Sequence, residues 1–132
     1  NFHMFNYLKK FKKPILLSTG MSDINEIKES HSYLKKYNKN IFLLHCISNY
    51  PTKDTDVNLG FLRDLNKISN WKIGYSDHTL GIDAANLAVT MGSKIIEKHF
   101  TLSKKKGING CVNYGHQRII GFTKSGKKKR TN

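Results

Sequence analysis

Short apolar runs divide the first hundred residues and predict buried β-strands at 15–19, 41–46, 71–77 and 94–100. Apolar residues occur at both odd and even positions of these runs, which is typical of parallel strands covered on both faces. The stretches between the runs repeat apolar residues every three or four positions, as amphipathic helices do. This repeated strand–helix unit predicts an α/β protein with a parallel sheet and right-handed crossovers.

Local signals place the ends of the helices. Residues 1–13 have an apolar residue at every third position and predict a short helix, which Pro14 ends. Asp23 is positioned to cap the next helix, with Glu26 completing a capping box. Gly92 suits the position just past a helix C-terminus. The helix before the last run is marked by Ile82, Ala85, Ala88 and Val89.

The repeat fits two architectures. About four strand–helix units match half of a (β/α)8 TIM-barrel type fold, which usually needs roughly 250 residues. They would also fit a small doubly wound sheet. The first strand–helix turn, STGMSD, contains no G-x-G-x-x-G, so the sequence does not support a dinucleotide site.

Strand parity gathers polar side chains at one end of the predicted sheet. Side chains two positions apart share a face of a strand. One choice of parity forms an inner surface at the carboxyl ends of the strands, where barrels and open α/β sheets bind ligands. His45 has the opposite parity and is expected to face the helices. The inner set is Ser18, Ser48, Ser76, His78, Glu97 and His99.

His78 and His99 end two adjacent predicted strands, which would lie about 4.8 Å apart. Their imidazoles could converge on one divalent ion and leave positions open for water and substrate, or they could make structural hydrogen bonds. Asp77 or a backbone carbonyl could orient a ring. Glu97 could act as a general base or bind substrate hydroxyls, or pair with a lysine. The serines could bind a phosphate or carboxylate, or only cap strand ends.

The formal net charge of +14 usually indicates nucleic acid or an anionic surface as partner. Residues 1–102 hold 14 Lys and Arg and all nine acids, whereas residues 103–132 hold nine basic residues and no acid. The excess therefore belongs mostly to an irregular basic tail, in which 119–122 could form a short strand. A small nucleic-acid-binding module using GKKKR (126–130) is the alternative function, although that cluster lacks interleaved aromatics.

Targeting signals and a disulfide framework are both missing from the sequence. No signal peptide and no apolar run of about 18 residues is visible, so a cytoplasmic protein without a membrane partner is expected. Cys46 lies in an apolar run and predicts a buried thiol, and Cys111 is far from it. The chain begins at Asn1 without Met, which indicates a fragment.

Five motifs follow one another along the first hundred residues: KPILLSTGM (13–21), LLHCISNYP (43–51), DVNL (56–59), GYSDHTLG (74–81) and EKHFTL (97–102). Together they resemble the sialic acid synthase family, the N-acetylneuraminate, legionaminate and pseudaminate synthases. The resemblance covers roughly residues 1–102, in the order and approximate spacing of the family.

The resemblance implies a TIM barrel that condenses phosphoenolpyruvate with an open-chain N-acylated hexosamine such as N-acetylmannosamine. The product is a nine-carbon 2-keto sugar acid, and phosphate is released. The family uses Mn²⁺ or another divalent cation such as Mg²⁺, and its full-length members are expected to be homodimers. Carried over by motif, the metal ligands are His78 and His99, the phosphoenolpyruvate positions are Ser18, Ser48 and Ser76, and the positions near the sugar are Tyr50 and Glu97.

The sequence also departs from this family. The first half-barrel and the C-terminal antifreeze-like domain are absent, and Ser48 is Asn in some members. SKKKGINGC replaces the segment that usually follows EKHFTL, which suggests a frameshift near 104–106. The predicted division is therefore a partial TIM-barrel synthase domain at 1–102 and a basic tail, frameshifted or disordered, at 103–132. A chain of this kind is expected to be an incomplete fragment without activity on its own.

Overall fold

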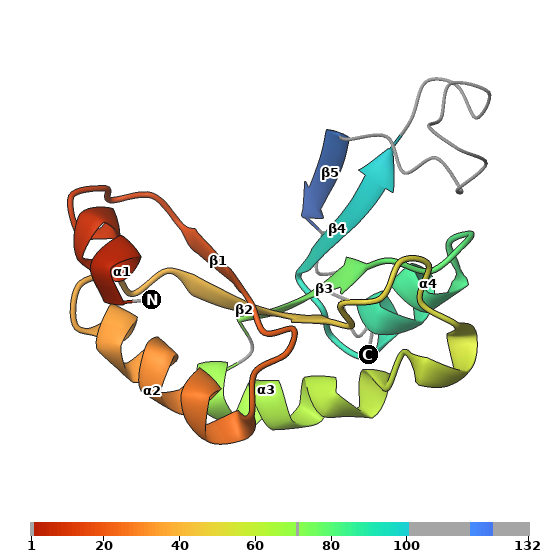
Figure 1. The fold of residues 1–132 in the computed structure, drawn as a ribbon, viewed down its shortest axis with the longest axis horizontal. Coiled ribbons are helices and arrows are strands. Elements are labelled where there is room, and N and C mark those ends of the chain that lie inside the picture. Colours follow the sequence, from red (N-terminus) through yellow and green to blue (C-terminus); the bar gives the residue numbers. More distant parts are fainter. Residues whose placement is uncertain (1, 71, 101–116, 123–132) are drawn as a thin grey trace, which may run out of the picture.

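The computed structural model describes residues 2–70, 72–100 and 117–122 (Figure 1). All four predicted strands and the helices between them are present. The helix predicted over residues 1–13 is shorter in the structure. It ends at Leu8, ahead of a lysine-rich run and Pro14. The elements are α1 (Phe2–Leu8), β1 (Ile15–Ser18), α2 (Ile24–Lys35), β2 (Ile41–Cys46), the 3-10 turns η1 (Asp54–Asp56) and η2 (Leu59–Phe61), α3 (Leu62–Ser69), β3 (Ile73–Asp77), α4 (Asp83–Thr90), β4 (Ile95–Phe100) and β5 (Gln117–Phe122).

The sheet has the strand order β1-β2-β3-β4-β5. Its first four strands are parallel neighbours in chain order. The connecting helices α2, α3 and α4 all cover the same face, and the sheet curls around its other face (Figure 1). A doubly wound sheet would have helices on both faces. The structure therefore confirms an α/β fold of the partial TIM-barrel type.

The tail contributes one strand to the sheet. The strand predicted near 119–122 is present as β5, which pairs antiparallel to β4 and so does not continue the strand–helix repeat. The predicted boundary at 102 and the rest of the tail lie outside the described residues. Throughout the parts of the chain that the structure describes, no helix is long and apolar enough to cross a membrane.

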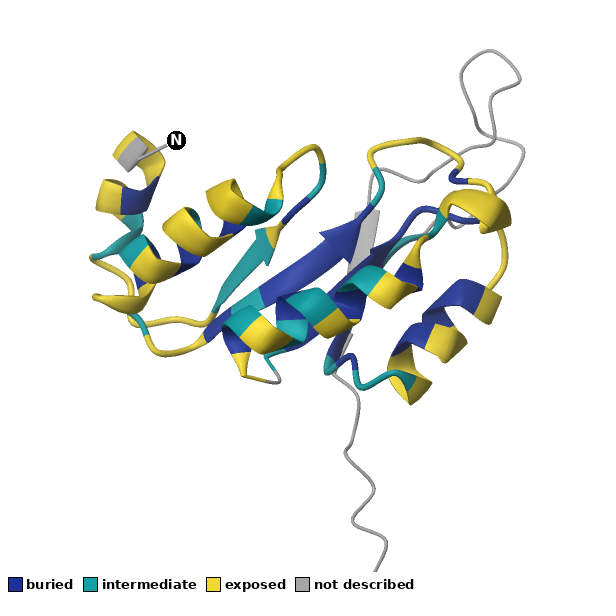
Figure 2. Ribbon diagram, turned by 90° about the horizontal axis from the view of Figure 1, so that it is seen from below, coloured by how far each residue is buried: buried dark blue, intermediate teal, exposed yellow. Residues whose placement is uncertain are grey.

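The main core lies between the sheet and its helices. Figure 2 shows that the buried positions of α2, α3 and α4 are those turned toward the strands. The strands supply Leu43, Ile73 and Tyr75, and the helices supply Ile27, Leu34, Leu62, Leu65, Ala84 and Ala88.

The predicted face of α4 is partly wrong. Ala85 and Ala88 are buried, but Ile82 is 63% exposed and Val89 is 40% exposed, and Ala84 is buried instead. Ile82 lies at the N-cap, where its φ of −130° is not helical, so it is not part of the helix face. Three alanines let the helix pack close to the sheet, which the longer residues would prevent.

The predicted start of α2 and the predicted end of α4 are both confirmed. Asp23 Oδ1 accepts hydrogen bonds from the backbone N–H groups of Asn25 and Glu26 at 2.7 and 2.9 Å. Glu26 Oε2 accepts from the Asp23 N–H at 2.9 Å, which completes the capping box. Gly92 has a φ of +101°, a conformation that glycine adopts more readily than other residues after a helix.

Gly74 allows β3 to lie close to its neighbours on the inner face. A Cβ at this position would lie 2.8 Å from the Ile95 carbonyl oxygen and 3.1 Å from Leu44 Cγ. We expect Gly74→Ala to lower the free energy of unfolding by about 1–3 kcal/mol, because the buried strands must move apart. Urea denaturation measures this change. Gly60→Ala is the matched control, since the nearest atom to its Cβ would be 3.7 Å away, and equal losses in the two variants would contradict the prediction.

Candidate functional site

The sheet register places Ser76 and Glu97 on one face of the sheet, as strand parity predicted. Cys46 is aligned with Ser76, and Ser76 with Glu97. Aligned residues of parallel strands point to the same side, and the helices cover the other side. His78 and His99 follow Ser76 and Glu97 by two positions and lie on this inner side, at the carboxyl ends of the strands.

Ser76 and Glu97 form a buried hydrogen-bonded pair on β3 and β4. Ser76 Oγ donates to Glu97 Oε1 at 2.7 Å and lies 3.3 Å from His78 Nε2. The two side chains are 3% and 8% exposed. Lys98, the next residue along β4, forms its ion pair with Asp77. Glu97 is thus a carboxylate directed into the candidate site.

His78 is held in one orientation by β2. Its Nδ1 donates to the carbonyl oxygen of Ile47 at 2.8 Å, so the neutral ring keeps its lone pair on Nε2. The orienting group is therefore a backbone carbonyl and not Asp77, the other candidate. The backbone N–H of Thr52 also donates to the His78 carbonyl at 2.9 Å, which ties the loop after β2 to the end of β3.

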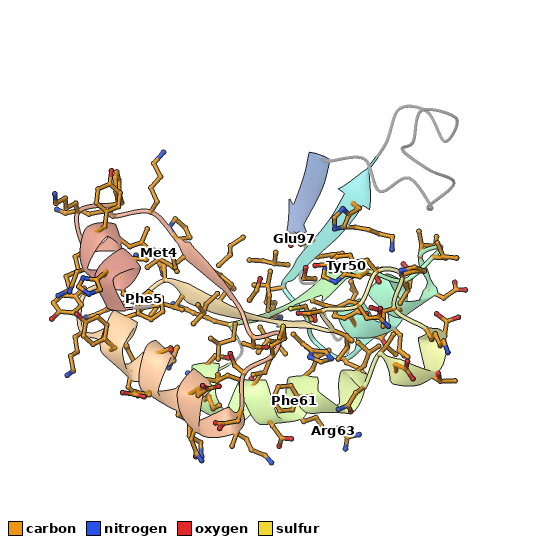
Figure 3. All side chains as sticks on the ribbon, in the orientation of Figure 1. Met4, Phe5, Tyr50, Phe61, Arg63 and Glu97 are labelled. Carbon is orange, nitrogen blue, oxygen red and sulfur yellow. The ribbon has the colours of Figure 1, made fainter. Side chains whose placement is uncertain are left out.

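Three rings meet at the ends of the strands. The ring centroids of His78 and His99 are 5.4 Å apart. Tyr50 lies against both, at 4.1 Å from His78 and 5.6 Å from His99. Tyr50 comes from the long loop after β2 and remains 48% exposed, on the same side of the sheet as Glu97 (Figure 3). Tyr50 is therefore the exposed member of the cluster, and the His78 ring beneath it is only 4% exposed.

The structure brings together five of the seven predicted site residues. They are Tyr50, Ser76, His78, Glu97 and His99, joined by the contacts above. Ser18 is exposed at the end of β1, and Ser48 is exposed in the loop after β2, next to Ile47. Reasoning from the sequence missed Gly20, where a Cβ would lie 2.6 Å from Ser48 Oγ and 2.7 Å from Cys46 Sγ. A glycine just past a strand end was the only sequence signal of this close approach.

The orientation of His78 is compatible with ligation of a divalent cation. The structure presents an Nε2 lone pair on His78, oriented by a carbonyl that bonds the other ring nitrogen, which is a usual arrangement for a ligating imidazole. Over residues 2–70, 72–100 and 117–122, no group of three or more His, Cys, Asp or Glu is assembled that could hold a metal. These residues could therefore supply two ligands, leaving positions for water and substrate.

His45 faces the helices, as predicted. Its Nε2 donates to the Val57 carbonyl at 2.8 Å, and its ring lies between Phe61 and Tyr75. Burial lowers the pKa of His45 below its usual 6.5. It is a packing residue of the core and takes no part in the ring cluster. The lysine-rich segment 126–130 of the nucleic-acid alternative lies outside the described residues.

The lowered pKa of His45 predicts a pH dependence of stability. The unfolded chain takes up a proton below about pH 6.5 while the folded chain resists protonation, so stability is complete above that pH and falls as the pH drops. The slope for this group is at most about 1.4 kcal/mol per pH unit. Urea denaturation at pH 7.5 and 5.5 measures how much the free energy of unfolding falls as the pH is lowered. This fall should be smaller for His45→Gln than for the unmodified chain. His3 lies on the exposed side of α1 and is the control. If His3→Gln reduced the pH dependence of stability as much as His45→Gln, the burial of His45 would not be its cause.

Comparison with known proteins agrees with the fold and with the resemblance of the sequence. The sequence profile of the NeuB family matches residues 1–112. The chain is 46% identical over 98 residues to the N,N'-diacetyllegionaminic acid synthase of Legionella pneumophila, covering 70% of this chain and 28% of that protein. It is 38% identical over 104 residues to the human N-acetylneuraminate-9-phosphate synthase, covering 76% of this chain and 29% of that protein.

A solved structure agrees with this assignment. The N-acetylneuraminic acid (sialic acid) synthetase of Leptospira borgpetersenii superposes with a TM-score of 0.72 at 33% identity, over 85% of this chain and 40% of that one. The chain thus spans less than a third of the two curated synthases, at 28% and 29% of their length. Since the family profile matches most of the sequence, the chain belongs to the NeuB family.

Proposed function

We propose that this chain supplies the metal-holding part of the active site of a sialic-acid-type synthase. The reaction joins phosphoenolpyruvate to an N-acylated hexosamine, N-acetylmannosamine or an analogue, and releases phosphate. The observation that carries the proposal is the cluster of His78, His99 and Tyr50 next to the Ser76–Glu97 hydrogen bond. The synthase names of relatives from Legionella and human support the reaction class.

His78 and His99 are the proposed ligands of a divalent cation, Mn²⁺ or Mg²⁺. When bound, this ion would supply a Lewis acid for the aldehyde oxygen of the sugar. The Ile47 carbonyl holds the His78 ring in place for this role. Tyr50 packs on that ring with half of its surface exposed, so it can contact the sugar.

The serines are proposed to bind phosphoenolpyruvate. Ser76 is buried beside Glu97, whereas Ser18 and Ser48 are exposed at the ends of β1 and β2. Their hydroxyls can donate to phosphate or carboxylate oxygens, whereas the N–H groups of Asn25 and Glu26 at the start of α2 are already bonded to Asp23.

Glu97 is proposed to act on water. Carbon 3 of phosphoenolpyruvate bonds to the aldehyde carbon, whose oxygen becomes a hydroxyl by taking up a proton. Water then adds to carbon 2 and gives one proton to Glu97, which balances the proton taken up by the aldehyde oxygen. The hydroxyl left on carbon 2 becomes the keto group as the bond to the phosphate oxygen breaks, and its proton leaves with the phosphate. The hydrogen bond from Ser76 holds the carboxylate in position for the transfer.

Because the chain spans 28% of the Legionella synthase, we expect activity only when the remaining strand–helix units are supplied. Residues 15–100 should therefore replace the matching segment of that enzyme, and phosphate release from phosphoenolpyruvate should be measured with the N-acyl sugar and Mn²⁺. The chimera is expected to be active, His78→Ala within it to be inactive, and Asn86→Ala on the exposed side of α4 to be unaffected. A chimera with a cooperative thermal transition but no phosphate release would refute the proposal. Assembly as a homodimer and a cytoplasmic location stay predictions for the whole protein.

A further inference from the structure

A buried ion pair lies on the helix-facing side of the sheet, behind the candidate site. Lys98 Nζ on β4 is 2.6 Å from Asp77 Oδ2 on β3. The Asp77 side chain is fully buried, and that of Lys98 is 26% exposed. A further ion pair, Asp64 with Lys67, lies on the surface of α3.

This ion pair sits one residue before each candidate metal ligand. Asp77 precedes His78, Lys98 precedes His99, and Asp77 and Lys98 are aligned in the parallel register of β3 and β4. Successive side chains of a strand point to opposite faces. The pair therefore joins the two strand ends from behind, while the histidines project to the inner face from the same ends.

The residues around the ion pair also fix the backbone after His78. Asp77 Oδ1 accepts from the backbone N–H and the hydroxyl of Thr79 at 2.9 and 2.8 Å. Lys98 Nζ donates in addition to the Thr79 carbonyl oxygen at 3.0 Å. His78 is thus flanked on both sides by residues bonded into the same network. Its own carbonyl is held by Thr52.

We propose that the Asp77–Lys98 ion pair is a positioning element that sets the separation of the His78 and His99 rings, and so the geometry of the metal site. The metal part of this inference rests on the proposed function. Ordinary stabilisation is a weak explanation for such a pair, because the cost of desolvating two charges offsets much of their attraction. Fixing a geometry is the role that its location favours.

Asp77→Asn tests this role with little change of shape. Asparagine keeps an oxygen that can accept from Thr79 but loses the charge that attracts Lys98. Asp64→Asn, which breaks the surface ion pair of α3 by the same substitution, is the matched control. Lys98→Arg keeps the positive charge and serves as the conservative variant.

Two measurements on the full chain separate positioning from stability. Without metal, the nuclear Overhauser effect between the ring protons of His78 and His99 reports the separation of the two rings. The cross-peak is assigned by its disappearance in His99→Ala. With metal, electron paramagnetic resonance of free Mn²⁺ reports affinity. Asp77→Asn is expected to weaken the ring–ring cross-peak and to lower Mn²⁺ affinity by about 10- to 100-fold. Asp64→Asn and Lys98→Arg are expected to retain both.

The outcomes separate the two proposals. A full cross-peak in folded Asp77→Asn would overturn the positioning role, as would an equal loss in Asp64→Asn. If Asp77→Asn fails to fold, loss of the cross-peak in folded Lys98→Met supports the role, and its retention there overturns it. If the unmodified chain binds no Mn²⁺ but its cross-peak depends on the ion pair, the metal assignment fails and the positioning role stands.

Discussion

Replacing His99 with alanine is expected to weaken Mn²⁺ binding by more than about 100-fold. Loss of an orienting group behind a ligand costs about 10- to 100-fold in metal affinity, and loss of the ligand itself should cost more. His99 is one of only two histidines in the ring cluster, at 5.4 Å from His78 between ring centroids. No nearby group of three or more metal-binding side chains within the described residues could compensate.

Electron paramagnetic resonance of free Mn²⁺ measures this loss in the purified chain. His3→Ala is the matched control, because His3 is exposed on α1 and reports binding by a surface histidine. His99→Ala that binds Mn²⁺ as tightly as the unmodified chain would exclude His99 as a ligand. An equal loss in His3→Ala would show that the binding is not at the strand ends.

Replacing Glu97 with glutamine is expected to lower kcat for phosphate release by about 10²- to 10⁴-fold, the usual contribution of a positioned general base. Glutamine retains the shape of the side chain and an oxygen that can accept the hydrogen bond from Ser76. It cannot take a proton from water. Since Glu97 is proposed to act on water and not as a ligand, Mn²⁺ affinity should be preserved.

The chimera with the Legionella synthase provides the assay, with kcat and Mn²⁺ affinity measured on the same preparation. Ser76→Ala is the companion variant, because it removes the hydrogen bond and leaves the carboxylate. It should lower kcat less than Glu97→Gln. A Glu97→Gln chimera with unchanged kcat would exclude the role in catalysis, and parallel losses of kcat and Mn²⁺ affinity would instead make Glu97 part of the metal site.

Much of the candidate site was predictable because parallel strands impose a simple geometry. Once residues 71–77 and 94–100 are recognised as strands, parity places Ser76, His78, Glu97 and His99 on one face. The register aligns Ser76 with Glu97, and the rings of His78 and His99 are in contact. The same argument put His45 on the other face. Tyr50 was different, because loop geometry follows no period, and only the motif resemblance indicated it.

Errors occurred where periodicity competes with packing. Ile82 and Val89 fit a helical period with Ala85 and Ala88. Only the alanines are buried against the sheet, and Ile82 and Val89 are exposed. Phe11 continues the spacing of the first helix, but that helix ends at Leu8 and Phe11 is 46% exposed. β5 was recognisable as a strand, but its antiparallel pairing with β4 was not.

The sequence by itself determined the strand–helix repeat, the parallel sheet and the set of polar residues at its carboxyl edge, because burial on both faces and side-chain alternation are local properties of the chain. Only the tertiary structure decided that the Ile47 carbonyl orients His78 and that Asp77 binds Lys98 across two strands. Residues 47 and 78, like residues 77 and 98, are separated by more than twenty positions. Their contacts depend on the register and curvature of the assembled sheet, which no local pattern specifies.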